Sequence, residues 1–462
     1  MIEFAVRWRN FRSLEDTGWL EIRPLTIILG PNASGKTSLI APLLVLKQTV
    51  ESVESSLAMK TQGALFNAGT YRNLIFSHSA ERTLSLGLRF HFHDPKQEKE
   101  EIKPVGNYPP GVAELDFVAT DNGLAPILQR YAIHDILARP MLVRKRLKSG
   151  FYSLGGPLAP TPGIDLFQAA KRSSPIHFMF TAESVFREQY RQDVKRSQQH
   201  RERSADNPPV HLKIEAPIQR YLAIITYVEQ YFESLLSRIA YVGPLRERPQ
   251  RLYELSGEAP ETVGVRGEAA PEIIFRNRGS ELNRIVNKWI NRFDFGFDLQ
   301  CEDLSEGVFN VVVRRTNSSP PINLADTGFG LSQVLPLIVQ GVYAPPDSLM
   351  IAEQPEIHLN PKLQTVLADL FVDVAKHNRA VLVETHSEHL LLRLRRLVAE
   401  GEISAENVAL YFVEREGDKS QVREVSMKQN GHIPDWPKGC FGESLRESLA
   451  LAAAQDRRKP NA

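Results

Sequence analysis

The stretch Gly30-Pro31-Asn32-Ala33-Ser34-Gly35-Lys36-Thr37 decides the fold of this chain, because it matches the P-loop pattern G-x-x-x-x-G-K-[ST]. An apolar segment, Leu25 to Leu29, precedes it and predicts a buried strand, and residues from Ser38 to about Val50 have the apolar spacing of a helix. Glycines let the backbone N–H groups point at phosphate oxygens, while the lysine adds a charge and the threonine a hydroxyl for magnesium. The residues expected to bind ATP here are Asn32, Ala33, Ser34, Gly35, Lys36, Thr37 and Ser38.

Composition narrows the class of protein. A chain of 462 residues suggests two to three structural units. Lys and Arg number 56 against 55 Asp and Glu, so there is no global basic field for coating nucleic acid. Two distant cysteines, Cys301 and Cys440, make neither a disulfide framework nor a zinc cluster. No apolar run reaches the roughly 20 residues of a membrane span, and the start lacks the pattern of a signal peptide. We expect a cytoplasmic protein without a membrane partner.

The order of elements predicts an α/β protein interrupted by an insertion. We expect residues 1–95 to open a nucleotide-binding lobe, residues 96–240 to form an inserted, partly helical region, residues 241–430 to complete the lobe, and residues 431–462 to form a tail. The patterns predict further strands at 83–92, 308–314, 348–352 and 380–383, and helices at 182–203, 218–239 and 281–293.

Three further motifs complement the P-loop. Glu353 is the first acid after the strand at 348–352, which makes it the candidate for the magnesium shell together with Thr37. Gly328 and Gly330 precede an apolar helix whose N-terminus can receive an anion. His386 follows another strand end and could hydrogen-bond a γ-phosphate or the attacking water. Together with Glu384 and His389 it could also suggest a metal site, but a third convergent ligand at metal spacing is missing.

These motifs, in this order, resemble the ATPase heads of the ABC/SMC branch, and specifically bacterial AAA-family ATPases related to OLD nucleases. The resemblance implies an ABC-type P-loop ATPase head with a mixed β-sheet core, ATP and Mg²⁺ as cofactors, and Glu353 as the Walker B acid. It implies that Gly328, Gly330 and Ser332 form a signature that completes the ATP site of another protomer, so that ATP drives dimerisation or higher assembly. Residues 358–361 resemble the D-loop and His386 the switch histidine. Arg12 lies in a segment that resembles the family's opening, where an arginine reaches the nucleotide.

One departure from this family concerns the base of hydrolysis. Gln354 stands where the family has a catalytic glutamate, and glutamine cannot accept a proton at neutral pH. Either Glu356 substitutes, or hydrolysis is slow and the ATP-bound state is long-lived. We favour slow but real turnover, because positioning and charge stabilisation carry most of phosphoryl transfer.

Two functions remain open. The first is a regulatory ATPase that assembles with itself and controls a separately encoded effector, a nuclease or a toxin, as the resemblance to the anti-phage systems Septu and PARIS implies. In its support, the residues after Ser387 contain no D-x-D acid cluster of a nuclease. The second is a DNA-repair or chromosome-associated ATPase that acts on DNA. The basic segments at 144–148 and 187–203 could touch nucleic acid or form a solvated face.

Overall fold

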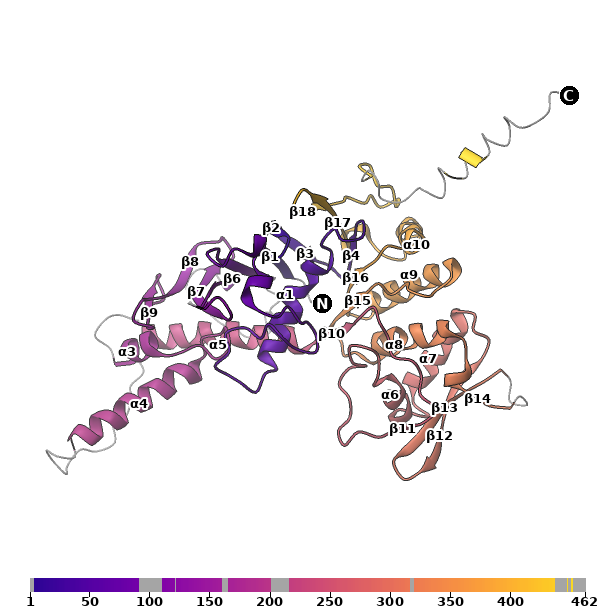
Figure 1. Ribbon diagram of the computed structural model, residues 1–462, viewed down its shortest axis with the longest axis horizontal. Coiled ribbons are helices and arrows are strands. Elements are labelled where there is room, and N and C mark those ends of the chain that lie inside the picture. Colours follow the sequence, from indigo (N-terminus) through magenta and orange to yellow (C-terminus); the bar gives the residue numbers. More distant parts are fainter. Residues whose placement is uncertain are drawn as a thin grey trace. The chain divides into compact units, whose positions relative to one another are not determined.

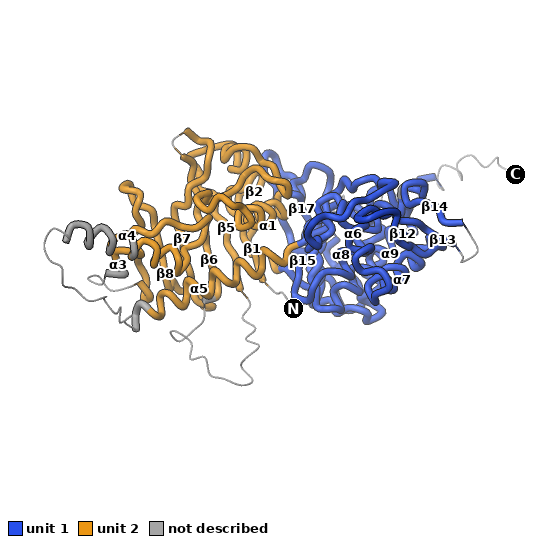
Figure 2. Tube along the Cα trace, turned by 90° about the horizontal axis from the view of Figure 1, so that it is seen from below, with its two compact units in different colours: residues 1–2, 22–37, 240–462 blue, residues 3–21, 38–239 orange. Residues whose placement is uncertain are grey.

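A computed structural model describes residues 4–90, 110–120, 122–159, 165–200, 216–315 and 320–436, with residues 447, 450 and 451. The chain forms two compact units, each built from separate stretches (Figure 2). Unit 1 comprises residues 1–2, 22–37 and 240–462, and unit 2 comprises residues 3–21 and 38–239. The expected boundaries at residues 95, 240 and 430 remain predictions. Within the described residues, no helix has the length and apolar character to span a membrane.

Unit 1 is built on a six-stranded mixed sheet with the strand order β10-β15-β16-β4-β17-β18. The pairs β15–β16, β16–β4 and β4–β17 are parallel, and β18 pairs with β17 in the antiparallel direction at one edge. Every residue of β4, β15 and β16 is buried, as expected for parallel strands covered on both faces. The bounds are β4 Leu25–Leu29, β10 Ile239–Val242, β15 Leu349–Glu353, β16 Ala380–Glu384, β17 Val408–Glu416 and β18 Lys419–Glu424.

Helices α8, α9 and α10 pack against one another beside this sheet (Figure 1). Their apolar faces join the strands in one core, which includes Leu337, Phe371 and Leu394. A smaller antiparallel sheet and two more helices extend the same core. The bounds are α6 Ala270–Arg276, α7 Glu281–Arg292, α8 Phe329–Tyr343, α9 Pro361–Lys376, α10 Glu388–Ala399, β11 Tyr253–Glu254, β12 Asp298–Ser305, β13 Val308–Arg314 and β14 Ile322–Asn323.

Unit 2 is built on an eight-stranded sheet with the order β2-β1-β5-β6-β7-β8-β9, to which β3 adds at β1. All its pairings with given register are antiparallel. Phe232 of α5 packs edge-on against Phe90 of β5, so this helix covers one face of the sheet. The bounds are β1 Phe4–Phe11, β2 Leu14–Asp16, β3 Leu20–Ile22, β5 Leu84–Phe90, β6 Pro110–Ala119, β7 Pro126–Asp135, β8 Pro140–Arg146, β9 Tyr152–Gly155, α1 Thr37–Val50, α2 Tyr71–Leu74, α3 Asp165–Arg172, α4 Ala182–His200 and α5 Ala216–Ser237.

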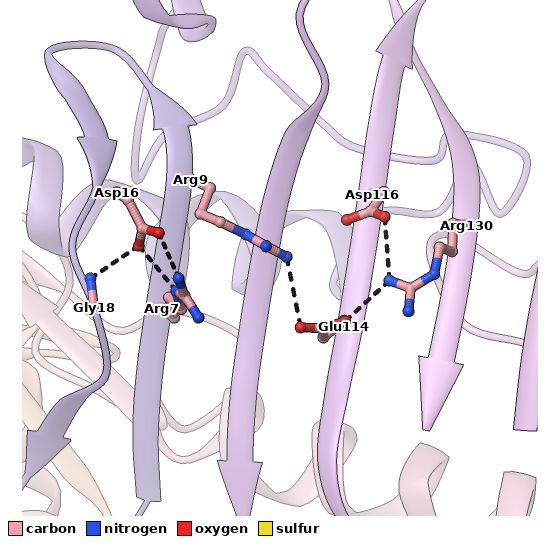
Figure 3. Close-up of polar contacts among 7 residues, drawn as sticks. All are labelled: Arg7, Arg9, Asp16, Gly18, Glu114, Asp116 and Arg130. Carbon is pink, nitrogen blue, oxygen red and sulfur yellow. Dashed lines mark hydrogen bonds and ion pairs between the residues drawn. The ribbon is translucent and has the colours of Figure 1, made fainter. Parts of the chain in front are cut away.

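The opposite face of this sheet carries a row of paired charges (Figure 3). Arg7 Nε donates to Asp16 Oδ1 over 2.9 Å, Arg9 reaches Glu114 at 3.5 Å, and Arg130 bridges Glu114 and Asp116 at 2.9 and 3.2 Å. Along β1, Arg7 and Arg9 alternate with the buried side chains of Val6 and Trp8, the pattern of a sheet with one polar face. Because the pairs are partly exposed, each contributes at most about 1 kcal/mol to stability.

The α/β class and the mixed sheet expected from the sequence are confirmed, and the expected elements lie within a few residues of their observed bounds. The sequence analysis does not predict β6 to β9, because the prolines in this region read as loop signals. Pro110, Pro126 and Pro140 are instead the first residues of β6, β7 and β8, a position where a strand tolerates a missing N–H.

One of the basic residues expected to be available to nucleic acid, Arg144, is not on the surface. Arg144 is fully buried, and it donates to the Tyr221 hydroxyl and to backbone oxygens at the end of α3. Its guanidinium stacks on the ring of Phe180 at 3.4 Å. The expectation that Arg144 could touch nucleic acid is therefore wrong, and it is a core residue of unit 2. The basic residues Arg201 and Arg203, as well as Cys440, lie outside the described residues.

The beginning of the tail packs on α10. Arg395 donates to the carbonyl oxygen of Gly431 over 2.9 Å, and its guanidinium lies 5.2 Å from the ring centre of Trp436. A Cβ at Gly431 would lie 2.2 Å from the Arg395 carbonyl oxygen, so only glycine fits there. Residues 431–436 thus have a packing role in unit 1, while Pro437 to Gly439 lie outside the described residues.

Candidate functional site

Three strands of unit 1 end at the same edge of the sheet, and the candidate site lies there. Glu353 ends β15 and pairs in register with Glu384 at the end of β16, which in turn pairs with Ile28 of β4. The P-loop begins two residues after Ile28. Because these strands are parallel, their carboxyl ends bring two acids to the P-loop, the position where ligands bind in α/β sheets.

The P-loop curls around its own lysine. Lys36 is 4% exposed, and its Nζ donates to the carbonyl oxygens of Gly30 and Pro31 over 3.1 and 2.7 Å. Burial lowers the pKa of Lys36, against the opposing effect of nearby carboxylates. Ala33 and Gly35 have positive φ angles of 59° and 100°, a backbone form that turns successive N–H groups to one side. The Ser420 hydroxyl of β18 donates to the Ser34 carbonyl over 2.6 Å and anchors the loop.

Gly30→Ala is expected to distort the loop. Gly30 has φ of 148°, and a Cβ there would lie 2.1 Å from the Val413 carbonyl oxygen of β17. Because that oxygen belongs to backbone, it cannot move without disturbing the sheet. We expect a lower melting temperature and at least tenfold weaker ATP binding, measured by thermal denaturation and by titration with a fluorescent ATP analogue. Gly257→Ala, where a Cβ would meet no atom within 4 Å, is the control; equal ATP affinity in both variants would contradict the prediction.

Two carboxylates face the hydroxyl of Thr37, the first residue of α1. Thr37 Oγ1 lies 3.2 Å from Glu353 Oε1 and 3.1 Å from Glu384 Oε2. Burial, together with the nearby Glu353, raises the pKa of Glu384 to about 7. A hydroxyl between carboxylate oxygens is a donor set that Mg²⁺ accepts. In the described part of the chain, no cluster of three or more His, Cys, Asp or Glu side chains could hold a metal, so a cation here would need ligands beyond this pair.

The segment after β15 brings the Glu356 carboxylate within hydrogen-bond distance of the His386 backbone N–H. The His386 N–H donates to Glu356 Oε1 over 2.6 Å, whereas Glu356 Oε2 is buried without a hydrogen-bond partner among the described residues. Burial raises the pKa of Glu356 and lowers that of His386, which favours a neutral imidazole. Gln354 has a positive φ of 45°, and its N–H donates to the Glu384 carbonyl over 2.7 Å. The sharp turn at Gln354 thus brings Glu356 back to the site.

The expected D-loop leads into α9. The Asn360 side chain caps this helix by accepting from the Leu363 N–H over 3.0 Å, and Pro361 is its first residue. Together these residues fix where the turn after Glu356 ends.

The remaining residues expected from the sequence have other surroundings. Gly328 caps the N-terminus of α8, Gly330 lies in its first turn, and Ser332 is buried. Asp326, just before them, forms a bidentate pair with Arg251 at 2.7 and 2.9 Å. Arg12 and Ser38 belong to unit 2, where the Arg12 guanidinium lies 5.5 Å from the ring centre of Phe66. The roles of these residues in nucleotide binding stay predictions.

Sequence reasoning does not include Glu384 among the site residues. The same signal that selects Glu353 could have found it, because both are the first acid after a buried apolar strand. Tyr241 and Arg246 are also absent from the expected site. Their segment stands out in the sequence, but only the fold shows that both contact β15 or the turn after it.

Comparison with known proteins identifies the family. Residues 25–393 match the family described as "AAA domain, putative AbiEii toxin, Type IV TA system", and residues 403–451 match a protein family of unknown function, DUF3696. The first match spans most of the chain, so the chain belongs to this AAA family. Membership of an AAA ATPase family indicates ATP binding and hydrolysis, typically with Mg²⁺. A comparison with curated proteins finds no match.

Solved structures of SMC heads are similar at low sequence identity. An SMC head bound to the C-winged helix domain of ScpA is 10% identical to this chain. The match covers 93% of this chain and 99% of the SMC head chain, with a TM-score of 0.41. The SMC head domain from Thermotoga maritima is 13% identical, with coverages of 92% and 99% and a TM-score of 0.38. An Smc head with an extended coiled coil, bound to the C-terminal domain of ScpA derived from Pyrococcus furiosus, is 10% identical, with coverages of 99% and 100% and a TM-score of 0.41. Because these TM-scores are low, family membership rests on the AAA match alone.

Proposed function

We propose that the chain is a regulatory ATPase that binds Mg·ATP at the P-loop of unit 1, hydrolyses it slowly, assembles with itself and controls a separate effector in anti-phage defence. The observation that carries the nucleotide site is the position of the Thr37 hydroxyl, 3.2 and 3.1 Å from the carboxylates that end β15 and β16. A P-loop threonine facing strand-end acids is the arrangement that phosphoryl-transfer sites use to hold magnesium.

The donor set fits Mg·ATP. Thr37 and Glu353 would hold the cation, with Glu384 as a second acid, and the amides of the P-loop would receive the phosphates. Magnesium supplies charge neutralisation to the β- and γ-phosphates when it is bound. Lys36 then exchanges the carbonyl oxygens of its own loop for phosphate oxygens. In this proposal the neutral His386 would hydrogen-bond the γ-phosphate or the attacking water.

Slow hydrolysis follows from the proton acceptors that the site offers. Gln354 occupies the position next to Glu353 and cannot take a proton from water. Glu356 carries the available carboxylate, but one of its oxygens is engaged by the His386 N–H. The ATP-bound state would therefore be long-lived and could act as a timer.

Gln354→Glu is expected to raise turnover about tenfold or more, because it adds a carboxylate beside Glu353 and a general base contributes at least about 100-fold when well placed. The measurement is phosphate release at saturating Mg·ATP, with Gln421→Glu, an exposed position on β18, as the control for added charge. Unchanged turnover in Gln354→Glu would reject a missing base at position 354 as the cause of slow hydrolysis and would leave Glu356 as the sole base.

Self-assembly and effector control rest on the resemblance of the signature region and on the family match. The description of the matched family names a putative toxin of a Type IV TA system. The direct experiment is copurification of the product of the neighbouring gene with the tagged chain, with and without Mg·ATP, together with the mass of the chain by light scattering. We expect association and a larger mass with ATP. Neither association nor a change of mass under either condition would reject this part of the proposal.

The alternative, an ATPase that acts directly on DNA, has less support from the described residues. Arg144 is buried, and Arg187 and Arg191 pair with Glu183 and Glu188 on their own helix. A DNA-acting enzyme would show DNA-stimulated hydrolysis that falls steeply with salt. We expect hydrolysis to be unchanged by DNA.

A further inference from the structure

The segment Tyr241 to Arg246 begins in β10, continues beyond the end of that strand, and contacts β15 at its functional end. The Tyr241 hydroxyl donates to Glu353 Oε2 over 2.6 Å, while Glu353 Oε1 lies 3.2 Å from the Thr37 hydroxyl. One oxygen of the Glu353 carboxylate therefore accepts a hydrogen bond from Tyr241, and the other faces the P-loop. Such a hydrogen bond fixes the rotamer of an acidic ligand and is a common device around metal sites.

Arg246 contacts the turn that follows the same carboxylate. Its side chain is 6% exposed, and its terminal nitrogens donate to the carbonyl oxygens of Glu353, Gln354 and Pro355 over 3.3, 3.5 and 3.4 Å. Its Nε is buried without a partner among the described residues. Three backbone oxygens thus converge on one guanidinium, which offsets their mutual repulsion in a site of low dielectric.

The turn held by Arg246 has a backbone form that needs support. A non-glycine residue with φ of 45°, such as Gln354, is in a sparsely populated backbone region that persists only where surrounding contacts hold it. Its N–H is held by the Glu384 carbonyl and its own carbonyl by Arg246. Without the guanidinium, the turn can relax, and Glu356, two residues further on, moves away from His386.

We propose that Tyr241 and Arg246 are positioning residues of the ATPase site with separate tasks. Tyr241 orients the Glu353 carboxylate toward the cation position, and Arg246 keeps the turn at 353–355 in the form that presents Glu356. The inference rests on the proposed Mg·ATP site. Because the two tasks differ, we expect Tyr241 to affect cation-dependent binding and Arg246 to affect turnover.

Tyr241→Phe tests the first task, because it removes one hydroxyl and keeps the ring. A fluorescent ATP analogue is titrated into the full chain with Mg²⁺ and again with EDTA. We expect about five- to tenfold weaker binding with Mg²⁺ and an unchanged affinity with EDTA. Tyr343→Phe is the matched control, because the Tyr343 hydroxyl donates to the Pro260 carbonyl at the far end of α8.

Arg246→Lys and Arg246→Met test the second task. We expect kcat to fall at least tenfold in Arg246→Met with KM within twofold, and a partial recovery of kcat in Arg246→Lys, which keeps the charge. Arg379→Lys is the matched control. Arg379 lies immediately before β16 and, like Arg246, donates to backbone carbonyl oxygens, those of Ala344 and Val342. Thermal denaturation of each variant verifies that it is folded, and Tyr241→Phe decides the first task even when Arg246→Met is unstable.

The outcomes separate this inference from the proposed function. Wild-type chain that fails to bind ATP in both conditions would overturn both. Wild-type chain that binds and hydrolyses ATP, with Tyr241→Phe and Arg246→Met equal to it within twofold in every measurement, would overturn the positioning roles alone. A loss of affinity in Tyr241→Phe that is equal with Mg²⁺ and with EDTA would also overturn the role of Tyr241.

Discussion

Lys36→Ala is expected to abolish nucleotide binding, with at least 100-fold weaker affinity for Mg·ATP, while the fold remains intact. Lys36 is the cation at the centre of the P-loop, and its Nζ already lies on the two carbonyl oxygens that phosphate oxygens would replace. The cost to stability is small because a net hydrogen bond contributes only about 1 kcal/mol and burial already disfavours the charged amine. Titration with a fluorescent ATP analogue measures the effect.

Lys362→Ala is the control for this change. Lys362 lies on α9, exposed, and pairs with Asp294. Both variants are expected to melt within a few degrees of the wild-type chain. Wild-type ATP affinity in Lys36→Ala would mean that residues 30–37 are not a nucleotide-binding loop, and the proposed function would fail with it.

Glu356→Gln is expected to lower kcat by about two orders of magnitude, the lower range for the loss of a general base. The amide oxygen can still accept from the His386 N–H, so the turn should keep its form while the proton acceptor is lost. ATP affinity is expected to stay within threefold. Single-turnover hydrolysis of bound ATP measures the chemical step without product release.

Glu400→Gln provides the comparison, because Glu400 pairs with Arg396 on the surface at the end of α10. An unchanged rate in Glu356→Gln would exclude this carboxylate as the base. If Gln354→Glu were also faster, the two results together would mean that the wild-type chain hydrolyses ATP without a general base, by positioning the phosphates alone.

The sequence predicts the elements around the site well because their signals are local. Leu25–Leu29 reads as a buried strand and the P-loop as the start of a helix, and both are observed. Strands β6 to β8 are missed because a proline at a strand start has the same sequence signal as a proline in a loop. The pairings of β1 with β5 and of β4 with β17 link residues far apart in sequence, so no local signal predicts them.

The residues of the candidate site likewise include some that the sequence predicts and some that only the fold reveals. Thr37 and Glu353 are predicted from motif and strand end, and the fold brings them within 3.2 Å. Arg144 is predicted as a surface cation because a run of basic residues carries no information about burial, and aromatic side chains from distant elements enclose it. Tyr241 and Arg246 precede Glu353 by about a hundred residues. Only the pairing of β10 with β15 makes their contacts visible.

The central claim is that residues 30–37, Glu353 and Glu384 form a site that holds Mg·ATP for much longer than a fast ATPase would. The most direct measurement is a single-turnover experiment in which labelled ATP is bound to the wild-type chain with Mg²⁺ and its hydrolysis is followed over time. We predict stoichiometric binding and a rate constant below about 0.1 s⁻¹. The absence of bound ATP, or hydrolysis faster than about 1 s⁻¹, the range of kinases, would contradict it.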